Sequence, residues 1–263
     1  MKISVIGAGA MGGAMVHGML KGSTFANADI TVADPSAKAL EQFETTGTTV
    51  TTNNALAAKS SDIVAVVVKP WLVESVLKGI MQSLDYNRQL LIVVAAGVSS
   101  AQIKEWLDKG DSTMIPLFLV IPNTAIAVMN SMTFVVPVGA SEEQTATVKA
   151  MFDEMGSTLI TEERLLAAGT TLASCGIAYA MRYVRAASEG GVEIGFKADD
   201  AKAIVLQTVK GAVELLQANG NHPEAEIDKV TTPGGVTIKG LNEMEHAGFT
   251  SAVIRGLKAG MKS

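Results

Sequence analysis

Residues 3–12 read Ile3-Ser4-Val5-Ile6-Gly7-Ala8-Gly9-Ala10-Met11-Gly12, and this stretch decides the fold. An apolar run leads into a G-x-G-x-x-G pattern, and a segment of helical length follows at 11–21. In such a pattern Gly7 permits a tight turn, Gly9 lets a phosphate group approach the backbone, and Gly12 lets the helix pack closely. Free N–H groups at the helix start attract an anion. The stretch predicts a strand, a phosphate-binding turn and a helix; the alternative is an ordinary structural turn.

Short apolar runs alternate with amphipathic segments up to about residue 160. The predicted strands are 2–6, 29–33, 63–68, 89–95, 112–120, 133–137 and 157–160. The predicted helices between them are 11–21, 36–45, 71–83, 100–109 and 141–155. Runs such as 63–68 do not alternate apolar with polar residues, which is typical of parallel strands covered on both faces. We therefore predict an α/β fold whose domain 1–160 is a doubly wound, Rossmann-type dinucleotide-binding sheet.

The second half of the chain has a helical pattern. The predicted helices are 162–188, 198–218, 236–247 and 249–261, with glycine-rich breaks between them. About 100 residues of such helices carry more apolar surface than a lone bundle of this size easily buries. We therefore expect 161–263 to be an all-helical substrate and dimerisation domain, and the protein to be a homodimer.

Composition excludes several other classes of protein. The 263 residues include 21 Lys and Arg against 26 Asp and Glu, a net charge of −5, so no basic surplus exists to bind nucleic acid. Cys175 is the one cysteine, which excludes a disulfide framework and fits a reducing cytoplasm. His17, His222 and His246 are widely spaced without a metal-ligand pattern, so we expect no metal.

Two segments bear on membranes and targeting. Residues 112–141 carry no charge, but prolines divide them into apolar runs too short for a membrane span, which takes about 20 apolar residues. We interpret them as buried strands. Met1-Lys2 leads straight into the first apolar run, so we expect no secretory signal peptide and a cytoplasmic protein.

An acidic residue follows the second predicted strand, about 20 residues beyond the glycine pattern. There the carboxylate of Asp34 could accept hydrogen bonds from an adenosine ribose, and it would repel a 2′-phosphate. The alternative is a turn residue, because Asp34-Pro35-Ser36 is also a turn sequence.

The third and fourth strands end in segments that should also face the cofactor, since ligands of such sheets bind outside the carboxyl ends of the strands. Lys69 could reach a phosphate or be a solvated rim charge, and Trp71 could cover the cofactor or pad the core. Small residues near Gly97 would admit a nicotinamide ring. The predicted contacts of NADH or NADPH are Ile6, Gly7, Ala8, Gly9, Ala10, Met11, Gly12, Asp34, Asn54, Val68, Lys69, Pro70, Ala96 and Gly97.

The run Val230-Thr231-Thr232-Pro233-Gly234-Gly235-Val236-Thr237-Ile238, with Glu245-His246-Ala247-Gly248-Phe249 after it, resembles the signature of pyrroline-5-carboxylate reductases. Supporting motifs, including Val68-Lys69-Pro70 and Pro122-Asn123-Thr124, occur in the expected order over nearly the whole chain. The resemblance implies NAD(P)H-dependent reduction of the C=N bond of 1-pyrroline-5-carboxylate to L-proline. It also implies a cytoplasmic enzyme whose helical halves form dimers and, beyond these, a ring such as a decamer.

The chain departs from the family pattern in its second half. Where the family usually has Ser-Gly-Ser-Gly-Pro-Ala-Tyr, this chain has Ala173-Ser174-Cys175-Gly176-Ile177-Ala178-Tyr179. Thr232 replaces a usual serine and keeps the hydroxyl, and Ala125 replaces a usual proline. The detailed wall of the substrate site is therefore expected to differ from the family's.

A substrate site is predicted around the segment 231–237. Backbone N–H groups and hydroxyls at a helix start suit a substrate carboxylate, and Thr237 could hydrogen-bond the ring nitrogen or deliver its proton through water. The alternative is a capping loop with a tight Gly-Gly bend. With the resemblance, the expected catalytic residue is Thr237, and the expected substrate contacts are Thr231, Thr232, Gly234, Gly235 and Gly176.

Two other functions fit the same two-domain pattern. A β-hydroxyacid dehydrogenase would need a general base, usually a lysine on the first long helix of the second domain, and residues 162–189 contain no lysine. A non-enzymatic dinucleotide-sensing protein would not need the hydroxyl-rich segment 231–237. Both alternatives are therefore less well supported than an imine reductase.

Overall fold

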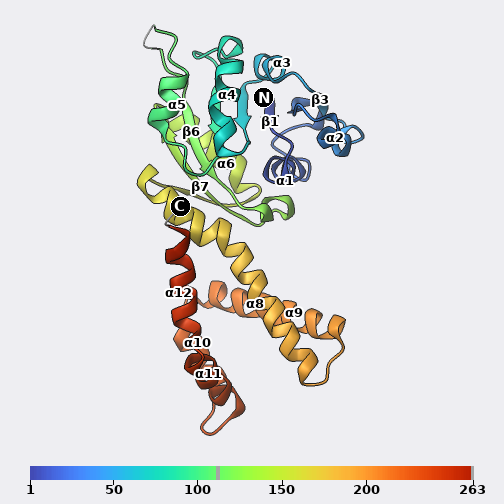
Figure 1. The fold of residues 1–263 in the computed structure, drawn as a ribbon, viewed down its shortest axis with the longest axis vertical. Coiled ribbons are helices and arrows are strands. Elements are labelled where there is room, and N and C mark those ends of the chain that lie inside the picture. The colour runs from blue at the N-terminus through green and yellow to red at the C-terminus, as the bar shows by residue number, and fades with distance from the viewer. Residues whose placement is uncertain (111–112, 262–263) are drawn as a thin grey trace. The chain divides into compact units, whose positions relative to one another are not determined.

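The computed structural model describes residues 1–110 and 113–261. The chain divides into two compact units, Met1–Ser174 and Cys175–Ser263. The first unit holds the sheet and the second is helical in its described part (Figure 1). The predicted α/β class with a helical second domain is confirmed.

One eight-stranded sheet forms the centre of the first unit, in the order β3-β2-β1-β4-β5-β6-β7-β8. Neighbouring strands from β3 to β6 are parallel, β7 runs antiparallel to β6, and β8 is parallel to β7. The strands are β1 (Ile3–Ile6), β2 (Ile30–Ala33), β3 (Thr49–Thr51), β4 (Ile63–Val66), β5 (Leu90–Val93), β6 (Leu117–Ile121), β7 (Ser131–Val138) and β8 (Gly156–Ile160). The order reverses at β1, so the carboxyl ends of β1 and β4 lie at the switch point where such sheets bind ligands.

Helices cover both faces of this sheet. They are α1 (Ala10–Met19), α2 (Ala37–Leu40), α3 (Asn54–Lys59), α4 (Pro70–Ile80), α5 (Ser100–Trp106), α6 (Glu142–Asp153) and α7 (Leu166–Gly169). One apolar cluster contains side chains of α1 and α6, and a second contains side chains of α3, α4 and α5. Fully buried strands between two helical layers explain why their sequences are continuously apolar.

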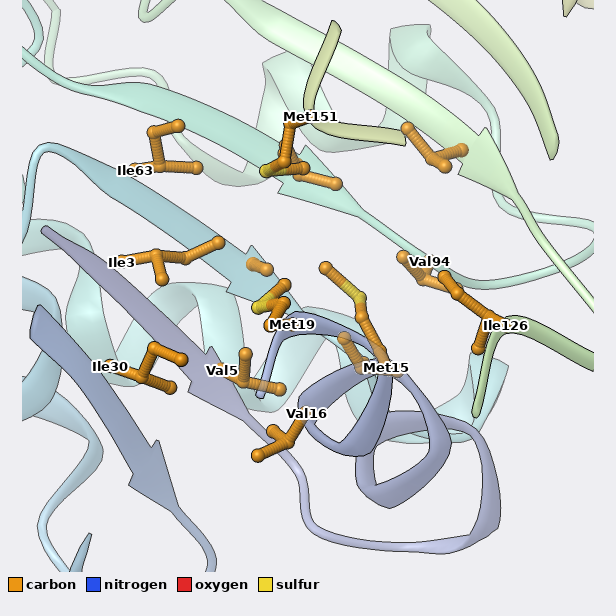
Figure 2. Close-up of a cluster of buried hydrophobic side chains, with 14 of the residues drawn as sticks. Ile3, Val5, Met15, Val16, Met19, Ile30, Ile63, Val94, Ile126 and Met151 are labelled. Atoms are coloured by element: carbon orange, nitrogen blue, oxygen red, sulfur yellow. The ribbon is translucent and has the colours of Figure 1, made fainter. Parts of the chain in front are cut away.

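Residues of β1 alternate between the two clusters. Ile3 and Val5 point toward α1, where they join Met15 and Met19 (Figure 2). Ile6 belongs to the opposite cluster and is 1% exposed. Burying a large aliphatic side chain stabilises the fold by about 1.5–3 kcal/mol, so this core fixes the position at which the glycine-rich turn begins.

The second unit consists of five helices in its described part. They are α8 (Cys175–Glu193), α9 (Ala198–Asn219), α10 (Pro223–Val230), α11 (Val236–His246) and α12 (Phe249–Gly260). Among residues 175–261, Ala201 is the one hydrophobic residue that is buried. Large apolar side chains such as Leu215 and Met181 are instead exposed, at 55% and 65%. Taken by itself, this unit has almost no core.

Several elements differ from the predicted ones. The strand predicted at 112–120 begins at Leu117, and residue 112 lies outside the described residues, as do the last two of the predicted domain 161–263. The helix predicted at 162–188 is interrupted by a π-helical turn, Thr170–Ser174. The boundary between the two compact units follows Ser174: Thr171 is buried, and Ser174 is hydrogen-bonded to Pro122 of the first unit. The elements β3 and α3 had not been predicted.

None of the helices in residues 1–110 and 113–261 is long and apolar enough to span a membrane.

Candidate functional site

The turn between β1 and α1 leaves no room for side chains at two of its glycines. Gly7 has φ +110°, and a Cβ atom there would lie 2.1 Å from the carbonyl oxygen of Val67, the residue directly after β4. A Cβ atom on Gly12 would lie 1.8 Å from the carbonyl oxygen of Gly7. At Gly9, by contrast, nothing lies within 4 Å of such an atom. The turn is therefore tightly packed toward the sheet and open on the side where a ligand would approach.

Helix α1 begins directly behind this opening. Its N-cap residue, Gly9, provides no side-chain cap, so the first N–H groups of α1 have no capping partner among the described residues. Uncapped N–H groups with the positive end of the helix dipole bind phosphate groups. The open space beside Gly9 and these N–H donors together form a phosphate cradle, which fits the pyrophosphate of a dinucleotide.

Asp34 follows β2 and is hydrogen-bonded on both carboxylate oxygens. Oδ2 accepts from the N–H of Ala8 at 2.8 Å, and Oδ1 accepts from the N–H of Ser36 at 2.9 Å. The bond to Ser36 shows that Asp34 stabilises the turn after β2, the alternative role considered for it from the sequence. The bond to Ala8 shows that the same carboxylate also fixes the glycine-rich turn. Each carboxylate oxygen has further acceptor capacity, so these bonds leave room for ribose hydroxyls.

Asn54, the first residue of α3, carries an unusual polar atom. Its Oδ1 is buried and has no hydrogen-bond partner in the described part of the chain. The neighbouring Asn53 instead caps α3 through the N–H of Leu56. A buried acceptor without a partner is costly, and a ligand hydroxyl would satisfy it. Asn54 also lines an open hollow formed with Ser75 and Val76 of α4.

The remaining predicted cofactor residues lie at the ends of three strands. Ile6 ends β1, Val68-Lys69-Pro70 follows β4, and Ala96-Gly97 follows β5. Lys69 is exposed and is the N-cap of α4, and Gly97 has φ +79°. The side chain of Trp71 is 75% exposed, so it does not pack into the hydrophobic core of this unit. The structure thus brings these residues to the carboxyl edge that also carries the glycine-rich turn.

The predicted substrate residues 231–235 form a tight turn between α10 and α11 in the second unit. Gly234 has φ +71°, and Gly235 donates its N–H to the carbonyl of Thr232 at 2.9 Å. A Cβ atom on Gly235 would lie 2.4 Å from Oγ1 of Thr232. The hydroxyl of Thr231 donates to the carbonyl of Asp228 at 3.1 Å, so it caps the end of α10.

Thr237 lies in the first turn of α11, which starts after Gly235 without a side-chain cap. It is half-buried, and within residues 1–110 and 113–261 its hydroxyl makes no hydrogen bond. The first N–H groups of α11 and this hydroxyl therefore offer donors to a carboxylate and to a neighbouring polar atom. Gly176 lies on another element of the same unit, the first turn of α8, where a Cβ atom would meet open space.

Other sequence candidates have structural roles. Nε2 of His17 lies 3.2 Å from Oε1 of Gln42, and its ring packs against Phe43. Nδ1 of His222 accepts from the N–H of Glu224 and so caps α10. No group of three or more His, Cys, Asp or Glu side chains capable of holding a metal occurs in the described part of the chain.

Sequence reasoning missed two contacts at the carboxyl edge of the sheet. Glu163 is hydrogen-bonded to Ser100, and Ser174 to Pro122. The partners are 63 and 52 residues apart, and no local pattern marks either pair. The one available signal was the serine at 174 in place of a usual family glycine.

The doubly wound sheet with its glycine-rich turn at the switch point is typical of dinucleotide-binding proteins, a class that includes the nicotinamide-dependent oxidoreductases.

Comparisons with known proteins narrow this class. A sequence family described as pyrroline-5-carboxylate reductase dimerisation matches residues 163–263. A second, described as NADP oxidoreductase coenzyme F420-dependent, matches residues 2–97. The pyrroline-5-carboxylate reductase of Arabidopsis thaliana is 31% identical over 99% of this chain and 93% of its own length. The chain therefore belongs to the pyrroline-5-carboxylate reductase family.

Further relatives agree with this assignment. Pyrroline-5-carboxylate reductase 1 of Dictyostelium discoideum is 38% identical over 97% of this chain, which spans 48% of that relative's length. The solved structure of Plasmodium falciparum pyrroline carboxylate reductase with NADP bound matches with a TM-score of 0.90 and 25% identity, over 100% of this chain and 96% of that one. The Streptococcus pyogenes enzyme matches with a TM-score of 0.87 and 28% identity, over 99% and 96%.

Proposed function

We propose that this chain reduces the C=N bond of 1-pyrroline-5-carboxylate to give L-proline, using NADH or NADPH. The observation that carries the proposal is the turn 231–235 leading into α11. There the first N–H groups of the helix have no side-chain cap, and the nearby hydroxyl of Thr237 makes no hydrogen bond to any other described residue. This arrangement suits a small anion that also bears a polar ring atom. Membership of the family supports the same substrate.

Reduction of the imine requires a hydride on carbon and a proton on nitrogen. The nicotinamide cofactor supplies the hydride when it is bound. A protonated cyclic imine is already electrophilic, so the main task of the protein is to hold it in a reactive position. The N–H groups at the start of α11 would bind the carboxylate, with Thr231, Thr232, Gly234 and Gly235 shaping the turn around it. Gly176 would provide a further, unobstructed contact.

Thr237 is the proposed catalytic residue. Its hydroxyl would hydrogen-bond the ring nitrogen and hold it, or pass a proton to it through a water molecule. In this role the hydroxyl orients the imine and keeps its nitrogen protonated while the carbon accepts the hydride. No metal is required for either step.

The proposed cofactor contacts are the fourteen residues predicted from the sequence. The pyrophosphate would lie against the open side of Gly9, and the ribose near Asp34 and Asn54. The loop that carries Ala96 and Gly97 would receive the nicotinamide. Among the described residues, Oδ1 of Asn54 has no hydrogen-bond partner and α1 has no side-chain cap, and both observations support this placement.

We also propose that the helical unit forms a homodimer and that the enzyme is cytoplasmic, with a ring such as a decamer as the larger assembly. An apolar groove in this unit is lined by side chains of α8 and α12, among them Tyr183, Phe249 and Val253. These three side chains are 44–48% exposed, and a second copy would cover them. The matched dimerisation family supports the same surface.

Oxidation of NADH or NADPH on addition of 1-pyrroline-5-carboxylate tests the activity. We expect turnover with this imine and none with a β-hydroxyacid and NAD(P)⁺, the control for the dehydrogenase alternative. Cofactor binding without turnover on either substrate would contradict the proposal and favour a dinucleotide-sensing protein.

A further inference from the structure

Residues 163–174, which we call the strap, connect β8 to α8 and belong to the first compact unit. The strap starts with a short 3-10 helix (Glu163–Leu165), continues through α7 and ends in the π-helical turn. A π-helical turn is rare and often marks a functional position. Polar side chains at the two ends of the strap are hydrogen-bonded to the sheet edge that carries the proposed cofactor site.

Glu163 anchors the first end of the strap. One of its carboxylate oxygens accepts from the N–H of Ser100 at 2.8 Å, and the other accepts from the hydroxyl of Ser100 at 2.5 Å. Ser100 is the first residue of α5 and lies three residues after Gly97. Hydrogen bonds to a charged group are stronger than neutral ones, so Glu163 holds the end of the β5–α5 loop.

Ser174 anchors the other end. Its hydroxyl donates to the carbonyl of Pro122 at 2.7 Å, and Pro122 directly follows β6. Because β5 and β6 are parallel neighbours, their carboxyl ends lie at the same edge of the sheet.

The segment after Pro122 extends the contact toward the glycine-rich turn. Asn123 is 4% exposed, and its side chain accepts from the N–H of Ala125. The 3-10 helix that follows, Thr124–Val128, packs against α1, where a Cβ atom on Gly18 would lie 2.6 Å from the carbonyl oxygen of Ile126. A displacement of Pro122 would therefore also displace Thr124–Val128 and, through it, α1, the helix whose start forms the phosphate cradle.

We propose that Glu163 and Ser174 are positioning residues for the reaction. Through the strap, they fix the β5–α5 and β6 loops in the arrangement that receives the nicotinamide end of the cofactor. The proposal rests on the proposed cofactor site. A loop that is held in its binding conformation binds its ligand more tightly, because less of the protein occupies conformations that cannot bind.

The test compares wild type with Glu163→Ala, Glu163→Gln, Ser174→Ala and Ser174→Thr. The dissociation constants of NADH and NADPH are measured by titration without imine, and kcat and KM with 1-pyrroline-5-carboxylate. We expect Glu163→Ala to weaken cofactor binding by about tenfold. Glu163→Gln keeps one acceptor oxygen and should lose about a third as much. Ser174→Ala should lower kcat about three- to tenfold, and Ser174→Thr should restore it to within about twofold.

Two control variants remove similar groups that make neither the Glu163–Ser100 nor the Ser174–Pro122 contact. Glu162→Gln breaks an exposed ion pair with Arg164, and Thr147→Val removes a hydroxyl that donates within α6. Both should keep wild-type binding and kinetics. If Glu163→Ala and Ser174→Ala change only the melting temperature and match these controls in cofactor affinity and kcat, the proposal is overturned. The titration contains no imine, so it tests the role of Glu163 independently of the reaction. If the protein binds cofactor but fails to reduce 1-pyrroline-5-carboxylate, the proposed function is refuted while the effect of Glu163 on cofactor binding can still be measured.

Discussion

The hydroxyl of Thr237 is the group on which the proposed chemistry depends most directly. Replacing Thr237 by Ala should lower kcat/KM by about 10- to 1,000-fold, the loss expected for one or two catalytic hydrogen bonds. The cofactor dissociation constant should change little, since the glycine-rich turn is untouched. Thr208→Val is the matched control, because that hydroxyl only bonds the carbonyl of Ile204 within α9. Wild-type kinetics for Thr237→Ala would remove this residue from the mechanism.

Asp34 determines the expected choice of cofactor. A 2′-phosphate on the ribose would place negative charge beside the carboxylate, and each pair of charges repels by about 4 kcal/mol at 4 Å and an effective dielectric constant of 20, before screening. We therefore expect NADH to be used at least as well as NADPH. Measurement of kcat/KM with both cofactors checks this, and a preference of more than about tenfold for NADPH would show that Asp34 turns away from the ribose.

Substitution at Asp34 separates its two roles. Asp34→Ser should raise the efficiency with NADPH and lower it with NADH. Asp34→Asn is the better-matched variant, because its amide oxygen can still accept from Ala8 or Ser36 while the charge is gone. If the charge of Asp34 determines the cofactor preference, Asp34→Ser and Asp34→Asn should both shift the ratio of kcat/KM values toward NADPH. A loss with both cofactors would instead assign Asp34 mainly to holding the turn.

Glu154 gives the molecule an acid-sensitive contact. Hydrogen bonds from Ser23 and then Thr24, at the loop after α1, lower the pKa of this carboxyl to about 2. Because the folded-state pKa is depressed below its usual value of 4.5, the stabilisation is complete above about pH 4.5 and is lost as the pH falls toward 2. Urea denaturation at several pH values should show this loss.

The variant Glu154→Gln should flatten that pH dependence. At pH 7 it should lower the free energy of unfolding by about 1 kcal/mol, because an amide oxygen replaces a charged acceptor. Glu44→Gln, at an exposed position, serves as the control and should retain the wild-type profile. An unchanged slope between pH 4.5 and 2 in Glu154→Gln would show that other carboxylates carry the acid sensitivity.

At the scale of elements, continuous burial made the central strands predictable. Strands β1 and β4 are apolar at nearly every position because helices cover both faces. The edge strand β3 was missed because it has three residues and is not buried.

Within the candidate site, the residues that were predicted are those whose spacing along the chain is local. The glycine-rich turn and Asp34 follow from spacing along a single strand–turn–helix unit, so they were found. The bonds of Glu163 and Ser174 depend on which loops meet at the sheet edge, and that information is not local. The π-helical turn was not predicted either, since a single turn of this kind barely alters the apolar pattern of residues 162–188.

At the scale of the whole molecule, the helical unit should be stable only as an assembly. With Ala201 as the one buried hydrophobic residue among 175–261, a second copy must cover the remaining apolar side chains. We expect a dimer interface larger than about 2,000 Å² in total. Light scattering at micromolar concentration should give at least twice the mass of one chain. A fully active single chain would contradict this.

A charge in the groove of the helical unit should disrupt this assembly. Val253→Asp places a carboxylate beside Tyr183 and Phe249, where a partner would have to bury a charge, and burying a charge is costly even though Arg182 also lines the groove. We expect this variant to lose the dimer mass and most of its activity. Val128→Asp is the matched control, because Val128 is 59% exposed in the first unit, and it should remain assembled.

The central claim is that the protein transfers a hydride to an imine carbon. Incubation of the protein with 1-pyrroline-5-carboxylate and a cofactor deuterated at the transferring position, followed by mass spectrometry and NMR of the product, tests it most directly. The account predicts L-proline with one deuterium on the ring carbon that was doubly bonded to nitrogen. Unreacted imine, or proline without deuterium at that carbon, would contradict it.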